Sequence, residues 1–211
     1  MPRPRVYEPD RVLDAVESLA VAAGPGAVTI RAVSAAIGVS NGALYHTFGS
    51  RAGLMGRAWL RAGRRFLAVQ DELVELAMAD GDPREAVVAA ADAPVVFAER
   101  LPHSSAVFWA VSRDELLAAD PPDDVAAELR DAQRSLVALM IRLAGQLWDR
   151  KDALAVDTIT TCIVDLPTAI VLRRNRLSDP TARGHLRAAV RAVLDVGPPP
   201  SEKGKTSWDS A

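Results

Sequence analysis

The sequence predicts an all-α protein. Apolar residues recur at helical spacing along most of the chain, side-chain caps followed by proline mark several helix starts, and no segment shows the sustained alternation of a β-strand. The 211 residues are 49% hydrophobic and 25% charged, so the chain can bury a core. Nine helices are expected, over residues 10–23, 30–37, 41–48, 51–79, 83–100, 103–118, 121–150, 152–175 and 180–196.

The first expected helix carries a single apolar stripe. From Val12, apolar residues follow at i+1, i+4, i+7, i+8 and i+11, which is the spacing of one helix face. Gly24 stands where this helix should end, because glycine readily adopts the backbone conformation of a C-cap. Asp10 and Ser50 are expected to cap the first and fourth helices.

Asp-Pro pairs mark three further helix starts. Asp82-Pro83, Asp120-Pro121 and Asp179-Pro180 each place a side-chain acceptor before a proline, which lacks the N–H that would otherwise go unused. Two more prolines fall inside expected helices. Pro94 is expected to bend its helix and open space for a ligand, and Pro167 to kink its helix.

The composition excludes several classes of protein. Cys162 is the single cysteine, so a disulfide scaffold and a cysteine-type zinc finger are excluded and a reducing, cytoplasmic compartment is expected. The most apolar stretch, Leu154 to Leu172, contains Asp157, Asp165 and Pro167, so no membrane span is expected. The first residues lack the apolar core of a secretion signal.

The charge is distributed unevenly along the chain. Residues 1–65 hold nine Arg against four acidic residues, a balance of +5, whereas the remainder has 16 basic and 23 acidic residues, or −7. A basic N-terminal unit joined to an acidic body suits a polyanion-binding head. The alternative is an ordinary solvated face, since modest charge asymmetry is common.

Residues 29–54 predict a helix, a turn and a second helix. The first short helix has apolar residues at i, i+3 and i+7 from Ile30 and stops at Gly38, which can adopt the positive φ of a tight turn. Ser40 can cap the second short helix. Helix-turn-helix units of this kind place their second helix in the major groove of DNA.

The outer face of the second short helix suits contact with DNA. With Leu44 and Phe48 directed to the core, small and polar residues remain outside, and a small N-terminal half lets the helix backbone approach the bases. Asn41 can bind a base edge, and Tyr45 can reach a phosphate or a thymine methyl. Outside this helix, the guanidinium of Arg31 can take a guanine or a phosphate.

This segment resembles the TetR family of bacterial transcriptional regulators. The matching residues are Val12, Leu13, Ala15, Gly24, Thr29, Val33, Gly38, Val39, Ser40, Gly42, Leu44, Tyr45, Phe48, Ser50 and Leu54. Three positions depart from the family pattern. Thr47 stands where the family has His, with His46 one place earlier; Arg51 replaces the usual Lys; and Ile37 replaces the usual Ala.

The resemblance implies a set of DNA-contacting positions. These are Thr29, Arg31, Ser40, Asn41, Gly42, Ala43, Tyr45, His46, Thr47 and Arg51. Structural alternatives stand beside them. Tyr45 could pack on the first helix, His46 could be an idle surface residue, and Arg3 and Arg5 could form a solvated tail rather than a minor-groove arm.

Recognition of DNA by one short helix per subunit requires a dimer, because two copies related by a twofold axis read a palindrome. The last two expected helices are the candidate interface. Their apolar residues could equally be ordinary core; they are Ile159, Ile163, Leu166, Ile170, Val171, Leu186, Val190, Val193 and Leu194. The family resemblance favours an interface, since its members form a four-helix bundle from these helices.

The larger second part is expected to bind an effector. Aromatic and Met side chains give adaptable apolar walls, although such residues are core more often than pocket. The candidate effector residues are Phe97, Leu101, His103, Phe108, Trp109, Met140, Leu143 and Trp148. In this segment the chain resembles the family only in helix order and length.

Together these features predict a ligand-responsive transcriptional repressor, released from a palindromic operator by a small, mostly hydrophobic effector. A helix-turn-helix domain over residues 1–50, with three helices, is expected to precede a six-helix effector and dimerisation domain over 51–196 and a disordered tail over 197–211. No cofactor, metal or catalytic residue is expected, since no hydrolase, nucleotide-binding or zinc motif occurs. The rivals are an enzyme and an interaction protein that keeps the helix-turn-helix only as scaffold.

Overall fold

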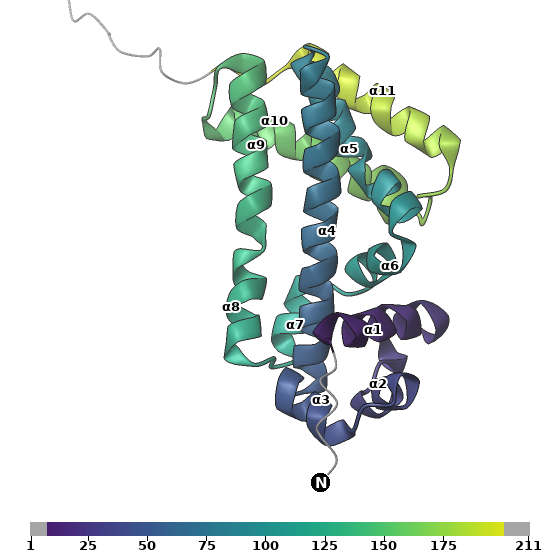
Figure 1. Cartoon of the computed structure of the whole chain (residues 1–211). Coiled ribbons are helices and arrows are strands. Elements are labelled where there is room, and N and C mark those ends of the chain that lie inside the picture. The colour runs from purple at the N-terminus through teal and green to yellow at the C-terminus, as the bar shows by residue number, and fades with distance from the viewer. Residues whose placement is uncertain (1–7, 201–211) are drawn as a thin grey trace, which may run out of the picture. The chain divides into compact units, whose positions relative to one another are not determined.

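The computed structural model describes residues 8–200, and all its regular elements are helical, so the all-α prediction is confirmed (Figure 1). Arg3 and Arg5, and the expected tail beyond residue 200, lie outside the described residues. The elements are α1 Pro9–Ala23, η1 Pro25–Ala27, α2 Ile30–Ile37, α3 Asn41–Phe48, α4 Arg51–Ala79, α5 Pro83–Arg100, α6 Pro102–Ala110, α7 Arg113–Ala118, α8 Asp123–Asp131, α9 Gln133–Trp148, α10 Ala153–Thr160, η2 Thr161–Asp165, η3 Thr168–Leu172 and α11 Pro180–Val196.

Several predicted helix boundaries are confirmed by their hydrogen bonds. Ser50 Oγ accepts from the backbone N–H of Gly53 at 3.0 Å, where α4 begins. Asp82 accepts from the N–H of Arg84 at 2.8 Å, and Asp179 accepts from the N–H groups of Thr181 and Ala182 at 2.9 and 3.3 Å. In each case a side-chain oxygen satisfies N–H groups that have no partner within the helix.

Two predicted caps are wrong. Helix α1 begins at Pro9 without a side-chain cap, so Asp10 lies in its first turn. Asp120 has a φ of 54°, and the helix that follows begins only at Asp123. The cause is Pro122, because a residue directly before a proline, here Pro121, is disfavoured in the helical conformation.

The expected helix over 103–118 is two helices, α6 and α7. The chain is extended at Val111, and Ser112 and Glu115 form a capping box that starts α7. A Ser followed three residues later by Glu is the sequence pattern of that motif. The expected helix over 121–150 is likewise divided, into α8 and α9 at Ala132.

The expected helix over 152–175 contains wide turns. After α10 the chain forms the π-helical segments η2 and η3, in which Leu166 N–H bonds Thr161 O and Arg173 N–H bonds Thr168 O, each an i to i+5 pair. Pro167 lies between them and supplies no N–H for an α-helical bond. The local distortion expected at Pro167 is therefore present.

The described residues fall into two compact units. The first unit comprises residues 8–69 and 96–135 and contains α1, α2, α3, the first part of α4, the end of α5, and α6, α7 and α8. Its buried apolar core is Val12, Leu13, Val16, Ala20, Val28, Ile30, Val33, Leu44, Phe48, Leu54, Met55, Ala58, Leu60, Val107, Leu116, Val125 and Leu129. The same core therefore supports the three N-terminal helices and residues of α6, α7 and α8.

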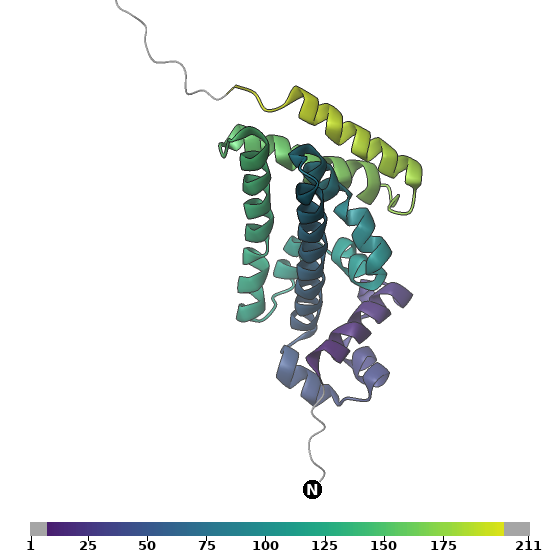
Figure 2. The ribbon, with the colours of Figure 1, turned by 45° about the horizontal axis from the view of Figure 1, so that its top comes forward.

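The second unit comprises residues 70–95 and 136–200 and has a core of its own. Helix α11 packs against η2 and η3, as Figure 2 shows. Ile159, Cys162, Val171 and Leu186 are each fully buried there. Burial raises the pKa of the Cys162 thiol to about 12, so this residue is a core side chain rather than a nucleophile.

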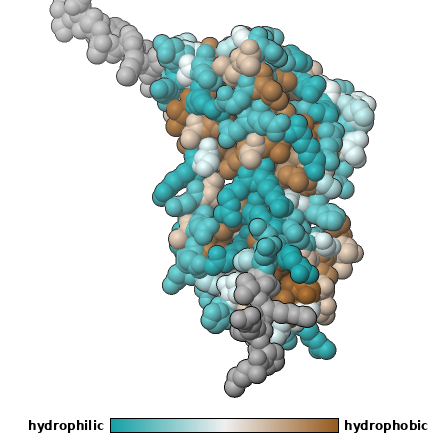
Figure 3. Space-filling model, viewed as in Figure 1, coloured by the Kyte–Doolittle hydropathy of each residue, from teal (hydrophilic) through white to brown (hydrophobic). Residues whose placement is uncertain are grey.

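One stretch of the described residues, Ala153–Leu172, is long and apolar enough to cross a membrane by length and composition alone. The core helix of a soluble protein passes the same test, and Ile159, Cys162 and Val171 lie in the second unit's core. In the view of Figure 3, hydrophilic residues cover most of the visible surface, with smaller hydrophobic patches between them.

Candidate nucleic-acid interface

Helices α2 and α3 form the predicted helix-turn-helix, with a capped start to each helix. Thr29 Oγ1 accepts from the N–H of Ala32 at 3.0 Å, and Ser40 Oγ accepts from the N–H of Ala43 at 3.3 Å. Gly38 ends α2 in the left-handed conformation, at φ 71° and ψ 26°. The roles predicted for Gly38 and Ser40 in the turn are confirmed.

The turn is also held by a side chain that the sequence analysis did not single out. Ser34 Oγ donates to the carbonyl of Val39 at 2.6 Å. A Ser in mid-helix is usually unremarkable in a sequence, and its partner lies beyond the helix end. This bond fixes the chain between the two helices.

The inner faces of the two helices bury their apolar residues. Val33 and Leu44 have no exposed surface and Phe48 is 1% exposed. They share a core with Val12 and Val16 of α1, and α1 contacts α2 while α2 contacts α3. The inner face predicted from spacing is therefore confirmed.

The outer face of α3 is accessible. Asn41, Gly42, His46 and Thr47 are exposed, and Tyr45 is 54% exposed. The remaining candidate on this helix is half-buried Ala43. More than half of the Tyr45 surface is exposed, so this residue is not part of the buried core.

Neither the backbone conformation nor a close contact within the described residues requires a glycine at position 42. Its φ is not positive, and a Cβ at this position would meet no atom within 4 Å. Glycine within a helix costs about 1 kcal/mol relative to alanine. The only evident consequence of Gly42 is an open backbone surface near the start of α3.

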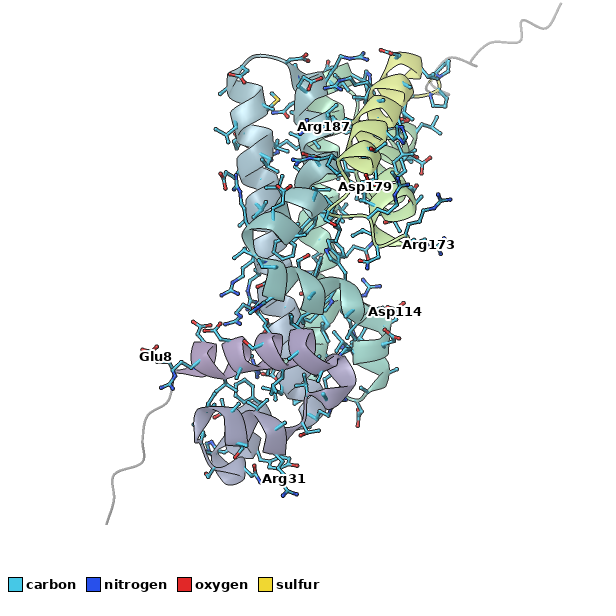
Figure 4. All side chains as sticks on the ribbon, turned by 90° about the vertical axis from the view of Figure 1, so that its right-hand side faces the viewer. Glu8, Arg31, Asp114, Arg173, Asp179 and Arg187 are labelled. Atoms are coloured by element: carbon cyan, nitrogen blue, oxygen red, sulfur yellow. The ribbon has the colours of Figure 1, made fainter. Side chains whose placement is uncertain are left out.

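At the start of α2, the N-cap residue Thr29 and Arg31 are exposed. Figure 4 shows the Arg31 side chain extending away from the ribbon. Within residues 8–200, the Arg31 side chain has no ion pair or hydrogen bond. Its guanidinium is therefore available to a partner.

Arg51 differs from the other candidates because its guanidinium is already bonded within the chain. Its Nε donates to the carbonyl of Val28 at 2.6 Å, and its Nη2 donates to the carbonyl of Pro25 at 2.8 Å. Both acceptors belong to the loop between α1 and α2. Arg51 is among the DNA-contacting positions that the family resemblance implies, and neither of these bonds is evident from the sequence.

A buried ionic cluster connects α1 with α4 and α6. Glu17 is 3% exposed, and its carboxylate lies 2.8 Å from Arg61 Nη2. Arg65 Nη1 lies 3.3 Å from Glu17 Oε2, and Ser104 Oγ donates to the same oxygen at 3.0 Å. Nothing in the local sequence distinguishes Glu17 from a solvated acidic residue, because its partners are 44 or more positions away.

The structure brings three of the candidate effector residues together. Phe97, Phe108 and Trp109 surround Phe66 in the first unit, with ring centroids 5.6, 5.5 and 5.3 Å from that of Phe66. Trp59 joins them, with its centroid 4.9 Å from that of Phe108. The indole Nε1 of Trp109 is buried without a hydrogen-bond partner.

The other candidate effector residues are dispersed. Leu101 precedes α6 and is half-buried, and His103 is exposed. Met140 and Leu143 lie in the core of the second unit, with Trp148 packed against it. Two surface pockets of the second unit, of about 300 and 410 Å³, are lined by none of the eight candidates.

The apolar residues named for a dimer interface lie mainly inside the second unit. Ile159, Leu186 and Val190 have no exposed surface, and Leu194 is 2% exposed. These side chains are core residues of one subunit. The exposed side of α11 carries instead Gly184, Ala188, Ala192 and Val196, the last of them 87% exposed.

Comparison with known proteins supports a helix-turn-helix DNA-binding protein. Residues 12–58 match the family model described as bacterial regulatory proteins, tetR family. No curated protein sequence matches. Several solved structures share the fold.

Three of these structures illustrate the likeness. A transcriptional regulator from Rhodococcus sp. Rha1 has a TM-score of 0.68 and 19% identity, covering 92% of this chain and 100% of that chain. The TetR family transcriptional regulator PfmR from Thermus thermophilus has a TM-score of 0.59 and 22% identity, covering 88% and 98%. A TetR-family transcriptional regulator from Streptomyces coelicolor has a TM-score of 0.60 and 21% identity, covering 90% and 98%.

The fold and the N-terminal match thus define the class, a DNA-binding transcriptional regulator. The resemblance to the TetR family is confirmed over residues 12–58, and the chain shares the fold of TetR-family transcriptional regulators. Regulators of this family are non-enzymatic, DNA-binding proteins, in agreement with the expectation of no catalytic activity. Within residues 8–200, no group of three or more His, Cys, Asp or Glu side chains is arranged to hold a metal ion.

Proposed function

We propose that this chain is a ligand-responsive repressor that binds an inverted-repeat operator in double-stranded DNA as a homodimer. The observation that carries the proposal is the outer face of α3, where Tyr45 is 54% exposed and Gly42 leaves the backbone open. An exposed glycine lowers the stability of a helix. The physical reason for a glycine at position 42 is that it lets a partner approach the backbone of α3 closely. A helix entering a major groove is such a partner contact.

The proposed DNA contacts divide by their chemistry. Asn41 has both donor and acceptor atoms for a base edge, and Arg31 has the planar fork that matches guanine or phosphate. Thr29 and Ser40 accept N–H bonds as caps, and each hydroxyl still carries a proton to donate to a phosphate. Gly42, Ala43, Tyr45, His46 and Thr47 complete the proposed surface.

The proposed dimer uses the outer side of α11 together with the preceding helical segment. Gly184, Ala188 and Ala192 follow at intervals of four residues, so they form one exposed row of small side chains. Small residues allow two helices to pack closely. A groove of about 410 Å³ beside this row is lined by Thr158, Thr161 and Val193, among others.

The proposed effector is small and mostly hydrophobic, and the cluster of Phe66, Phe97, Phe108 and Trp109 supports that class. The effector shifts the population toward a state in which α4 has rotated and the two recognition helices no longer match successive major grooves. A preference of about 1–3 kcal/mol for this state changes operator affinity about 5- to 150-fold. In this proposal residues 1–50 bind DNA, residues 51–196 bind the effector and form the dimer, and the protein acts in the cytoplasm.

Selection of bound duplexes from a random pool tests the proposal. The full chain should enrich an inverted repeat and sediment as a dimer. Tyr45→Ala should weaken binding to the selected duplex at least tenfold without lowering thermal stability, because the ring is exposed. Leu76→Ala, at an exposed apolar residue of α4 in the second unit, is the matched control and should bind as the wild type does. Failure to enrich any sequence, with a monomeric protein, would contradict the proposal.

A further inference from the structure

We infer that Arg51 is a positioning residue that closes the helix-turn-helix segment as a clasp, rather than a ligand of DNA phosphate. The inference rests on the proposed function, because it concerns how this chain holds its DNA-binding face. The guanidinium reaches back across 23 positions to Val28 and 26 positions to Pro25. It thereby joins the two ends of the segment that contains α2 and α3.

The two bonded loop carbonyls lie immediately before the helix-turn-helix. Val28 directly precedes Thr29, the N-cap of α2, and Arg51 directly follows Ser50, which caps α4. The ends of residues 29–50 are therefore linked by a side chain to a backbone carbonyl. Because the link is to backbone, it sets the position of the N-terminus of α2 relative to that of α4.

The segment between α1 and α2, which includes the short helix η1, gains a restraint beyond its own backbone hydrogen bonds. It contains Gly24 and Gly26, and glycine loses more conformational freedom on folding than any other residue. Val28 has no exposed surface, so its side chain holds one point of the loop in the core. The guanidinium of Arg51 holds the carbonyl oxygens at Pro25 and Val28, which the buried Val28 side chain cannot do.

The two hydrogen bonds of Arg51 depend on the planar shape of the guanidinium as well as on its charge. Nε and Nη2 donate together from one edge of a planar group, at 2.6 and 2.8 Å. A Lys at this position keeps the charge but has no planar fork, so it cannot reproduce both bonds in the same arrangement. The Arg51→Lys variant therefore distinguishes a role that needs both guanidinium hydrogen bonds from a role that needs only a positive charge.

The experiment compares the wild-type chain with Arg51→Lys, Arg51→Ala and a control, Arg64→Ala. Arg64 is an exposed cation of the same helix whose contact is with Glu128 in α8. Hydrogen exchange of the amides in residues 30–48 is measured without DNA. The equilibrium constant for binding the selected duplex is then measured over a range of salt concentrations.

A clasp predicts that both Arg51 variants exchange their α2 and α3 amides about tenfold faster than the wild type and the control. Both should bind the duplex about tenfold more weakly at fixed salt, with an unchanged slope of log K against log salt. A phosphate ligand predicts instead that Arg51→Lys binds like the wild type and that Arg51→Ala loses about 0.9 of a unit of slope. That result, or unchanged hydrogen exchange, would overturn the inference. The exchange measurement needs no operator, so it tests the clasp even if the proposed function fails.

Discussion

Ser104 of α6 donates a hydrogen bond from its hydroxyl to Glu17 Oε2 of α1, at 3.0 Å. The same hydroxyl accepts from Arg65 Nη1 of α4 at 2.8 Å. Glu17 and Ser104 are 3% and 2% exposed, so this contact is made away from water. The first helix of the DNA-binding segment is therefore tied by polar bonds to α6, which also carries Phe108 and Trp109 of the aromatic cluster.

The first prediction concerns the charge at Glu17. Glu17→Gln should lower the free energy of unfolding by about 3 kcal/mol, because it removes the buried carboxylate that pairs with both Arg61 and Arg65. Arg61, at 7% exposed, then keeps only its pairs with Asp10 and Asp14, whose side chains are 80% and 62% exposed. The measurement is equilibrium denaturation in urea. Asp14→Asn is the matched control, since the Asp14 side chain is 62% exposed and also pairs with Arg61, and it should cost less than about 1 kcal/mol. Equal losses for the two variants would refute this account.

Much of the fold follows from local sequence signals. The stripe that begins at Val12, the turn at Gly38 and the cap at Ser40 each involve residues within one helix or one turn, so spacing and residue type are enough to predict them. The breaks at Ser112 and Asp120 were also encoded locally. The signals are the capping box of Ser112 and Glu115, which starts α7, and the proline pair that follows Asp120, which delays the start of α8 to Asp123.

The contacts that support the candidate site could not be predicted from local sequence signals, because they join residues far apart in the chain. Glu17 with Ser104 and Arg51 with Val28 join residues separated by 87 and 23 positions, and nothing in the local sequence distinguishes these side chains from solvated charges. Tertiary packing decides which charged residue is buried. The outer face of α3 could be predicted because it is the complement of a buried face within the same helix.

The second prediction is a dependence of stability on pH that arises from Asp92. This carboxylate of α5 is 3% exposed and lies 2.6 Å from Arg183 Nη2 and 2.7 Å from Arg187 Nη2, both of α11 (Figure 4 labels Arg187). Burial raises the pKa of Asp92, but the hydrogen bonds from Arg183 and Arg187 outweigh it and the pKa is lowered from 3.8. A lowered pKa stabilises the folded state above pH 3.8, and this contribution is lost as the pH falls below that value.

Asp92→Asn should therefore have two effects. At pH 7 the free energy of unfolding should fall by about 3 kcal/mol, since two guanidinium groups lose their charged partner. Between pH 5 and about pH 2 the variant should lose less further stability than the wild type. Urea denaturation at a series of pH values measures both effects, with Asp165→Asn, at an exposed residue of the same unit, as control. Parallel pH profiles for wild type and Asp92→Asn would show that Asp92 is not the titrating group.

The third prediction concerns Gln70 of α4, which satisfies a carbonyl that Pro94 leaves without its helical donor. Pro94 lies inside α5 and has no N–H, so the carbonyl of Ala90, four residues earlier, loses its usual partner. Gln70 Nε2 donates to that carbonyl at 2.9 Å, and the Gln70 side chain is fully buried. The carbonyl that Pro94 leaves without a donor is thus bonded by a buried amide.

A double-mutant cycle tests this relationship. In the wild type, Gln70→Met should cost about 2 kcal/mol of unfolding free energy, because the buried Ala90 carbonyl is left without a donor. In a Pro94→Ala background the new N–H can bond that carbonyl, so Gln70→Met should cost at least about 1 kcal/mol less. Methionine also removes the Gln70 Oε1 atom, which is buried without a partner, but it does so in both backgrounds, so this effect cancels in the cycle. Additive effects in urea denaturation would mean that Gln70 and Pro94 act independently, and that the amide is there for another reason.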